Sequence, residues 1–214
     1  MNTKSALDKY GFVKLSSRKN ISTIQFALTI GSIIDVSPLS LVQTLIPRKK
    51  EDSQSNTYSG NYGIKFFPMH TDLAHWYLPP RYLLLRCIVP AHNVATNIIN
   101  LNDILKEEMK ELVRSALFRP RRKLNNKMYL LTLQQKDLFR WDSIFLKPAN
   151  KAGIILKNII EDRIKTIKES KIFLCESGDS LLIDNWKVMH GRDRIPNNSF
   201  NRKIERIYLS TVKI

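Results

Sequence analysis

Short apolar runs bounded by polar turns or prolines recur along the chain, and such runs predict β-strands. The clearest is RYLLLRCIV at 81–89, which follows Pro79-Pro80 and stops at Pro90. Because this run is apolar without alternation, it predicts a strand that is buried on both faces. Further strands are predicted around His190 and at 128–134, 138–146, 171–175, 180–184 and 206–212.

Apolar residues at helical spacing mark three other segments, which predict helices at 21–34, 102–117 and 148–168. The first has Asn20 or Ser22 as its N-cap and meets Gly31 as a breaker. The second has acidic residues in its first half, and the third carries a stripe of isoleucines. Between the first helix and the first strand, residues 47–63 are polar and predict a long loop of the kind that often serves function.

The order of these elements bears on the fold class. Helices interrupt a series of short strands without the regular strand and helix alternation of a parallel sheet. This order favours a mainly β protein with peripheral helices, built on a double-stranded β-helix, or jelly roll. The 214 residues fit one domain, 1–214, with a helical insert at about 102–168.

Composition and charge restrict the possible classes of binding partner only in part. The net charge of +16 is spread along the chain, with denser basic clusters at 48–50 and 119–123 that lack interleaved aromatic residues. A basic solvated surface and a preference for anionic substrates or partners both remain open, and nucleic acid is the less favoured partner. No run is long enough to span a bilayer and the N-terminus lacks a signal peptide, which predicts a cytoplasmic protein without membrane partners. Cys87 and Cys175 are expected to be buried free thiols, and the sequence leaves the oligomeric state open.

Candidate chemistry begins with His70 and Asp72, which stand two residues apart in FFPMHTDLAHW. In an extended segment such side chains share a face, although this motif alone is weakly specific. In GDSLLIDNWKVMHGR, a predicted hairpin carries His190 on its return strand. Two histidines and one carboxylate form the facial triad that holds Fe(II), and the later Arg202 suits a dicarboxylate cosubstrate.

Together these motifs resemble the taurine dioxygenase and clavaminate synthase-like family of Fe(II)/2-oxoglutarate-dependent oxygenases. The resemblance rests on HTD at 70–72, the following PPRYLLLRC, Thr96, GDSLLIDNWKVMHGR and the R-x-x-x-R pattern at 202–206, with FRWD at 139–142 as a lesser match. The motifs follow the family's order over residues 60–214, which is most of the chain.

The resemblance implies site residues and cofactors. His70, Asp72 and His190 would bind Fe(II), Arg202 would pair with the distal carboxylate of 2-oxoglutarate, and Thr96 would hydrogen-bond this cosubstrate. The role implied for Arg206 is less defined, near the cosubstrate or an anionic group of the substrate.

The implied reaction consumes O2 and 2-oxoglutarate, releases succinate and CO2, and hydroxylates an unactivated C–H bond of a small polar metabolite. An amino acid or an amino-acid-derived natural-product intermediate is the favoured substrate. Related halogenases have a small residue in place of the carboxylate, so Asp72 argues against halogenation. Desaturation and cyclisation stay open.

Other polar residues near these motifs have a structural and a functional interpretation. Packing is favoured for His75, a surface turn for His92, and a structural role for Arg140 and Asp142, as an ion pair, over substrate contact. The functional alternatives are a lid at His75 with Trp76, and anion binding at Arg192 or Arg194.

Two rival functions remain. One is a basic module that binds nucleic acid or a carrier protein and retains the fold without turnover. The other is an oxygenase whose substrate is anionic or tethered to a macromolecule. A pure binding module has no physical need for the intact set of His70, Asp72, His190 and Arg202, which favours an enzyme.

Overall fold

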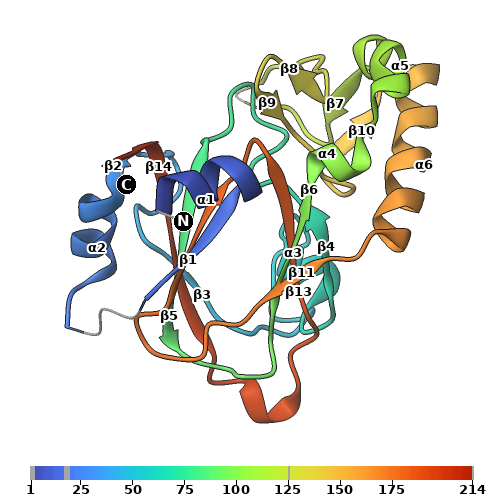
Figure 1. Ribbon diagram of the computed structural model, residues 1–214. Helices are drawn as coiled ribbons and strands as arrows, with labels where there is room; N and C mark the ends of the chain where they lie inside the picture. The colour runs from blue at the N-terminus through green and yellow to red at the C-terminus, as the bar shows by residue number, and fades with distance from the viewer. Residues whose placement is uncertain (1–2, 17–19, 125, 214) are drawn as a thin grey trace.

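Two antiparallel sheets face each other in the computed structural model, which describes residues 3–16, 20–124 and 126–213 (Figure 1). The larger sheet has the strand order β1-β12-β5-β14-β2, with β3 paired to β14. Its strands are β1 (Phe12–Leu15), β12 (Ser180–Asp184), β5 (Tyr82–Val89), β14 (Lys203–Val212), β2 (Gly31–Ile33) and β3 (Gln43–Leu45). The smaller sheet has the order β11-β6-β13-β4 and consists of β11 (Ser170–Ile172), β6 (Thr96–Asn100), β13 (Val188–Arg192) and β4 (Phe67–His70). The predicted jelly-roll class is confirmed.

The central strand of the larger sheet, β5, is buried on both faces, as its unbroken apolar run predicts. Leu83, Leu85 and Cys87 join the cluster between the sheets, together with Ile98 of the opposite sheet. Leu84 points the other way, into a cluster with Phe26 of the first predicted helix. Burial on both sides removes most of the strand's apolar surface from water and places β5 at the centre of the core.

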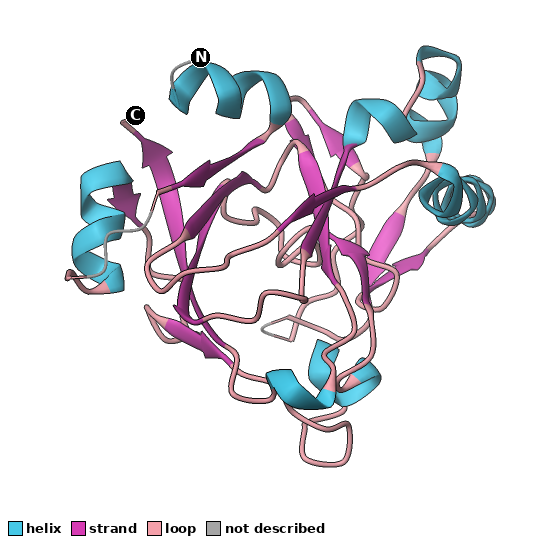
Figure 2. Ribbon diagram, turned by 60° about the horizontal axis from the view of Figure 1, so that its bottom comes forward, coloured by secondary structure: helices cyan, strands magenta, loops and turns pink. Residues whose placement is uncertain are grey.

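Helices cover the outer faces, as Figure 2 shows. α1 (Thr3–Tyr10) and α2 (Thr23–Ile30) pack on the larger sheet through Leu7, Phe26 and Ile30. Ser22 accepts a hydrogen bond from the Gln25 N–H while the Gln25 side chain returns to the Ser22 N–H, so α2 starts at a capping box. The prediction of a helix at 21–34 is confirmed, except that it ends at Ile30, where Gly31 begins β2.

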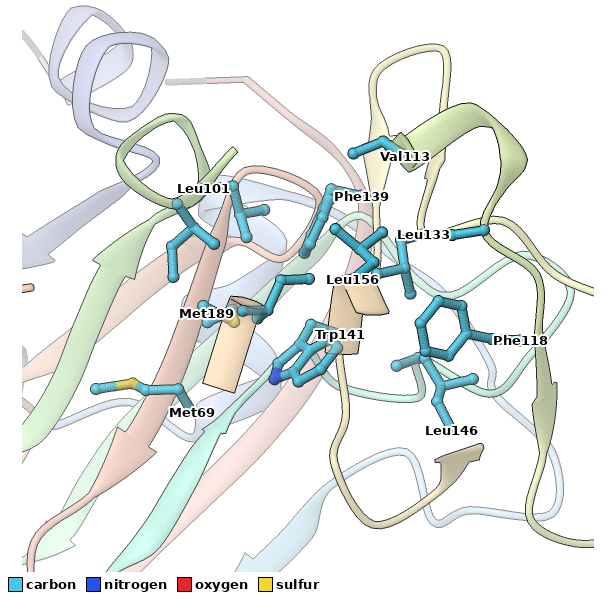
Figure 3. Packing of buried hydrophobic residues seen from close by; sticks show 14 of the residues in the cluster. Met69, Leu101, Val113, Phe118, Leu133, Phe139, Trp141, Leu146, Leu156 and Met189 are labelled. Carbon is cyan, nitrogen blue, oxygen red and sulfur yellow. The ribbon is translucent and has the colours of Figure 1, made fainter. Parts of the chain in front are cut away.

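The insert between β6 and β11 packs on the outer face of the smaller sheet. It contains α4 (Leu101–Ile104), η1 (Glu107–Met109), α5 (Lys110–Ser115), β7 (Phe118–Pro120), β8 (Gln134–Gln135), β9 (Leu138–Phe139), β10 (Leu146–Pro148) and α6 (Lys151–Thr166). Leu156 and Ile160 of α6 are fully buried in a cluster with Trp141 and Met189 (Figure 3). The isoleucine-rich segment at 148–168 therefore forms the predicted helix.

Several other predictions for the insert are wrong. The helix predicted at 102–117 is broken, because α4 stops at Ile104, whose carbonyl accepts a hydrogen bond from Arg163 of α6. The strand predicted at 138–146 is interrupted where Asp142 accepts the N–H groups of Ile144 and Phe145 in a turn. The strand predicted at 128–134 reduces to an isolated bridge at Leu131 and the short β8.

The remaining segments refine the prediction. The polar loop at 47–63 includes a short helix, α3 (Tyr58–Tyr62), capped by Thr57. A 3₁₀ turn, η2 (Asn197–Ser199), precedes β14. The predicted hairpin that carries His190 is wrong, because β12 belongs to the larger sheet and β13 to the smaller sheet. The turn after Asp184 takes the chain from one sheet to the other. Within the described residues, no helix combines the length and apolar character needed to cross a bilayer.

Candidate metal centre

Three potential metal ligands converge between the ends of β4 and β13. His70 is the last residue of β4, and it lies directly opposite His190 on β13. The Nε2 atoms of both histidines lie 3.5 Å from Oδ1 of Asp72. One potential ligand atom from each residue lies within 4.8 Å of the other two, and all three residues are buried. The structure thus brings together the three residues that the sequence motifs predict.

Asn185 fixes the backbone that carries Asp72. Its Oδ1 accepts the Asp72 N–H at 2.7 Å, and its Nδ2 donates to the carbonyls of Asp72 and Pro80 at 3.0 Å. All of these groups are buried, so losing the amide would leave several polar groups without partners. Asn185 is therefore more than the turn residue that the sequence suggests, because it links the β12–β13 crossover to a potential metal ligand.

The carboxylate of Asp72 uses its two oxygens differently. Oδ2 accepts hydrogen bonds from Arg206 Nη1 at 2.7 Å and from the Tyr208 hydroxyl at 2.9 Å. Oδ1 faces the two histidines. Burial alone would raise the pKa of Asp72, but the Arg206 guanidinium and the two imidazoles hold this pKa well below its usual range. Asp72 is therefore a carboxylate with one oxygen oriented toward the shared metal position.

Arg206 is held on its other side by Gln43 of β3, whose Oε1 accepts hydrogen bonds from Nε at 3.2 Å and Nη2 at 2.6 Å. The guanidinium is thus directed at Asp72, one of the three potential metal ligands. The motif resemblance predicts a place for Arg206 near the cosubstrate or an anionic group of the substrate, and the sequence-based predictions include neither Gln43 nor Tyr208. Tyr208 stands two residues after Arg206 on β14, so strand periodicity alone could have indicated it.

The imidazole rings are oriented by further contacts. His70 Nδ1 lies 2.9 Å from the Pro68 carbonyl, and the Tyr58 ring stacks on His70 with 4.1 Å between centroids. The Tyr58 hydroxyl donates to Asp142 Oδ2 at 2.8 Å. Burial, first of all, lowers the pKa of His190, which favours the neutral imidazole with a lone pair for a metal. Two imidazoles and one carboxylate form a donor set that fits Fe(II).

A cationic region lies on the same inner face. In the β6–β13 ladder, Thr96 lies opposite Arg192 and Ile98 lies opposite His190, so Thr96 shares the inward face with the metal ligands. Burial lowers the pKa of Arg202 to about 10. Among the described residues, no carboxylate lies within ion-pair distance of Arg202. A half-buried guanidinium without a described counter-ion is suited to bind an anionic ligand.

Arg192 has a structural task beside this region. Its Nη2 donates to the carbonyls of Gly63 at 3.0 Å and Lys65 at 2.7 Å, and its guanidinium lies 3.7 Å from the Phe67 ring centroid. Burial, and then the charge of Arg202, lower the pKa of Arg192 to about 9. Arg192 thus holds the segment that joins α3 to β4.

Arg140 and Asp142 are buried but do not pair with each other. Arg140 donates to the carbonyls of Ala74, Trp76 and Tyr77. Asp142 is satisfied by Tyr58 and by two backbone N–H groups. The proposed ion pair is wrong, while a structural role for both residues agrees with these contacts.

The other residues considered from sequence lie away from the ligands or lack polar partners. Burial lowers the pKa of His75 to about 4, and its ring centroid lies 5.5 Å from that of Phe145. His92 and Arg194 are exposed. Both cysteines are free as predicted, although Cys175 is only half-buried.

Comparisons with known proteins support the fold through structure alone. No protein-family model matches the chain, and no curated protein matches it. Three similar solved structures are OrfP, a non-heme iron oxygenase, with Fe, succinate and (3S)-hydroxy-L-Arg; PvcB from Pseudomonas aeruginosa; and asparagine oxygenase with Fe(II), 2S,3S-3-hydroxyasparagine and succinate.

The extent of these likenesses differs. OrfP superposes with a TM-score of 0.68 at 16% identity, covering 97% of this chain and 77% of OrfP. PvcB superposes with a TM-score of 0.65 at 12% identity, covering 96% of this chain and 78% of PvcB. Asparagine oxygenase gives 0.62 at 16% identity, covering 79% of this chain and 56% of the oxygenase. The chain therefore spans just over half the length of asparagine oxygenase.

The fold and the His-Asp-His group together define the structural class. The chain has the jelly-roll fold of the non-haem iron oxygenases, and PvcB among them is an Fe, alpha-ketoglutarate dependent oxygenase. At these identities the likeness concerns the fold, so the activity has to be argued from this chain's own residues.

Proposed function

We propose that the protein is a non-haem Fe(II)/2-oxoglutarate-dependent dioxygenase. The observation that carries this proposal is the buried group of His70, Asp72 and His190, with both Nε2 atoms 3.5 Å from one carboxylate oxygen. The group lies within a fold shared with iron oxygenases. A facial set of three protein ligands leaves coordination positions for other ligands, as this chemistry requires.

The residues around the triad have distinct tasks in this proposal. His70, His190 and Oδ1 of Asp72 would hold the iron, and Arg206 with Tyr208 keeps the other carboxylate oxygen turned away. Arg202 would bind the distal carboxylate of 2-oxoglutarate, and Thr96 would hydrogen-bond the same cosubstrate. When bound, iron, 2-oxoglutarate and O2 supply oxidation of a C–H bond with release of succinate and CO2.

The proposed substrate is a small polar metabolite, with a free amino acid or an amino-acid-derived natural-product intermediate as the first choice. OrfP and asparagine oxygenase are both seen with hydroxylated amino acids, which supports this choice. Hydroxylation is the proposed outcome, because Asp72 supplies a third protein ligand where halogenation would need a vacancy.

Anaerobic spectroscopy tests the cofactors without knowledge of the substrate. Adding Fe(II) and 2-oxoglutarate to the protein should give a weak visible charge-transfer band. The variant His190→Ala should lose the band, and Arg202→Gln should require much more 2-oxoglutarate to form it. Absence of the band, or an unchanged band in His190→Ala, would show that the proposed function is wrong.

A second experiment addresses the substrate class. Succinate formation is measured with the iron-loaded protein and a panel of amino acids that includes asparagine and arginine. A true substrate should increase succinate formation over the uncoupled rate and acquire the mass of one oxygen atom. If the charge-transfer band forms but no amino acid stimulates turnover, the substrate class is wrong while the cofactor assignment stands.

A further inference from the structure

A strongly basic segment extends from the insert at 118–131, described at 118–124 and 126–131, and we name it the basic arm. The two ends of the basic arm meet in an antiparallel bridge between Phe118 and Leu131. A second antiparallel bridge, between Leu124 and Lys127, lies near its tip. Its sequence FRPRRKLNNKMYLL contains five basic residues and no acidic residue. All five basic side chains are exposed, namely Arg119, Arg121, Arg122, Lys123 and Lys127.

The positive charge of the basic arm is not neutralised within the described part of the protein. None of its five basic side chains forms an ion pair with a described residue. Basic residues on the adjoining helices do pair, as Lys110 with Glu107, Arg114 with Glu111, and Lys157 with Glu161. Arg119 also lies opposite Lys147 in the β7–β10 ladder, which adds a further positive charge to the same region.

Exposed apolar side chains lie next to these charges. Tyr77 at 64%, Leu78 at 62% and Leu130 at 64% are the most exposed large apolar side chains among the described residues. The Tyr77 ring centroid lies 5.9 Å from that of Tyr129, so the loop 73–78 and the basic arm are neighbours. Met128 of the basic arm is also 42% exposed. Exposed apolar side chains gathered in one region typically indicate an interaction surface.

This surface is joined to the metal centre by short contacts. The Arg121 N–H donates to the Phe145 carbonyl at 2.7 Å. The Phe145 ring centroid lies 5.6 Å from that of Tyr58, which itself stacks on His70. On the other side, Arg140 holds the carbonyl of Tyr77. The basic arm is therefore connected to His70 through Phe145 and Tyr58.

The chemistry of the surface decides between kinds of partner. Apolar side chains bordered by cationic ones match the anatomy of protein interfaces, where charge complementarity selects the partner. A nucleic acid would use stacking aromatics, yet Leu78, Met128 and Leu130 are aliphatic and Tyr77 is the exposed ring here. We propose that the basic arm and the loop 73–78 together dock an acidic protein whose contact face carries apolar side chains.

Binding is tested with the full-length protein without iron or 2-oxoglutarate, so the result does not depend on the proposed oxygenase chemistry. The probe is a fluorescein-labelled amphipathic helical peptide with leucines on one face and glutamates on the other, measured by anisotropy. Wild-type protein should bind it with an affinity that falls as NaCl is increased. Reversing the charges with Arg121→Glu, Arg122→Glu and Lys123→Glu together should weaken binding about tenfold or more.

Two further variants separate the contributions of charge position and of apolar side chains to peptide binding. The triple change Arg48→Glu, Lys49→Glu and Lys50→Glu reverses the same charge in another exposed cluster and should leave the Kd within about twofold. The pair Tyr77→Ser and Leu130→Ser retains the charge and should also weaken binding. All of these side chains are exposed, and circular dichroism confirms that each variant is folded.

Three outcomes would overturn the proposal. The first is that wild-type protein does not bind the peptide. The second is that both charge-reversed triples weaken binding equally, which would reveal a nonspecific effect of net charge. The third is that labelled single-stranded RNA binds more tightly than the peptide and is unaffected by Tyr77→Ser with Leu130→Ser, which would assign the surface to nucleic acid.

Discussion

The carboxylate of Asp72 shows how one residue depends on its neighbours. Its Oδ2 is occupied by Arg206 and Tyr208, which leaves Oδ1 for the position shared with the histidines. The guanidinium of Arg206 offsets the energetic cost of burying the Asp72 charge. Removing Arg206 would leave this buried charge uncompensated. Arg206 is thus expected to act on metal binding, and Arg202 on the cosubstrate.

The first prediction separates these two arginines. In Arg206→Gln the affinity for Co(II), a spectroscopic substitute for Fe(II), should fall about 10- to 100-fold, because the carboxylate loses its orienting partner. Absorption titration measures this affinity. Arg202→Gln is the matched control and should bind Co(II) almost as wild type. Equal Co(II) affinity in both variants would contradict the role given to Arg206.

The second prediction concerns Tyr58 and Asp142. Tyr58→Phe keeps the ring on His70 but removes the hydroxyl that donates to the buried Asp142 carboxylate. The free energy of unfolding should fall by about 1–3 kcal/mol, the cost of an unsatisfied buried acceptor. Urea denaturation measures it. The double variant Tyr58→Phe with Asp142→Asn should recover part of this loss, and no recovery would argue against the pairing.

The third prediction follows from the pKa of His75, which burial lowers from 6.5 to about 4. Between these values the unfolded chain binds a proton at His75 that the folded protein does not, so stability falls as the pH decreases from 6.5 to 4. The contribution reaches about 3.5 kcal/mol at most, at about 1.4 kcal/mol for each pKa unit. In His75→Gln, urea midpoints measured across this range should depend less steeply on pH, and an unchanged slope would contradict the prediction.

At the scale of single residues, the sequence predicted best what depends on local spacing. His70 and Asp72 stand two apart, and His190 follows a recognisable turn, so these candidate ligands could be proposed from the sequence alone. The roles of Asn185 and Tyr58 could not be predicted from the sequence, because their partners are distant in sequence. These contacts exist only after folding. Arg206 was noticed for its charge, yet its target was set by Gln43 and Asp72.

At the scale of elements, burial explains which predictions succeeded. β5 and α6 carry long and consistent apolar patterns, and both exist as predicted. Segments 102–117 and 138–146 have comparable patterns, but they are interrupted where Arg163 contacts Ile104 and where Asp142 forms a turn. The short edge strands β1 to β3 lack a distinctive pattern, because half-exposed strands of three or four residues contain too few alternating positions.

The fourth prediction tests the packing of α6. Leu156 is fully buried, whereas its neighbour Ile155 is 43% exposed. Leu156→Ala should lower the free energy of unfolding by about 2–5 kcal/mol through lost burial and a cavity. Ile155→Ala, the matched control, should change it by less than about 0.5 kcal/mol. Thermal and urea unfolding measure both, and similar losses in the two variants would contradict the observed orientation of the helix.

At the scale of the whole molecule, metal binding should be linked to global stability. The ligands come from β4, its following loop and β13, so a bound ion favours the folded chain over the unfolded one. The fifth prediction is that Co(II) at about 100 times its Kd adds about 2.7 kcal/mol. This should raise the Tm by about 5–10 °C for a chain of this size. Calorimetry measures the shift, and His190→Ala should show none.

The insert leaves the jelly roll after β6 and returns in β11, and these two strands are hydrogen-bonded neighbours. Such an excursion could be lengthened or exchanged during evolution without reordering the sheets. The middle part of the insert could not be exchanged in this way, because it contacts the candidate metal centre. The Trp141 carbonyl accepts the Thr71 N–H, and Asp142 accepts a hydrogen bond from the Tyr58 hydroxyl. Homologous chains should accordingly vary most in the parts of the insert that lie outside the basic arm, while the short stretch from Arg140 to Asp142 changes slowly.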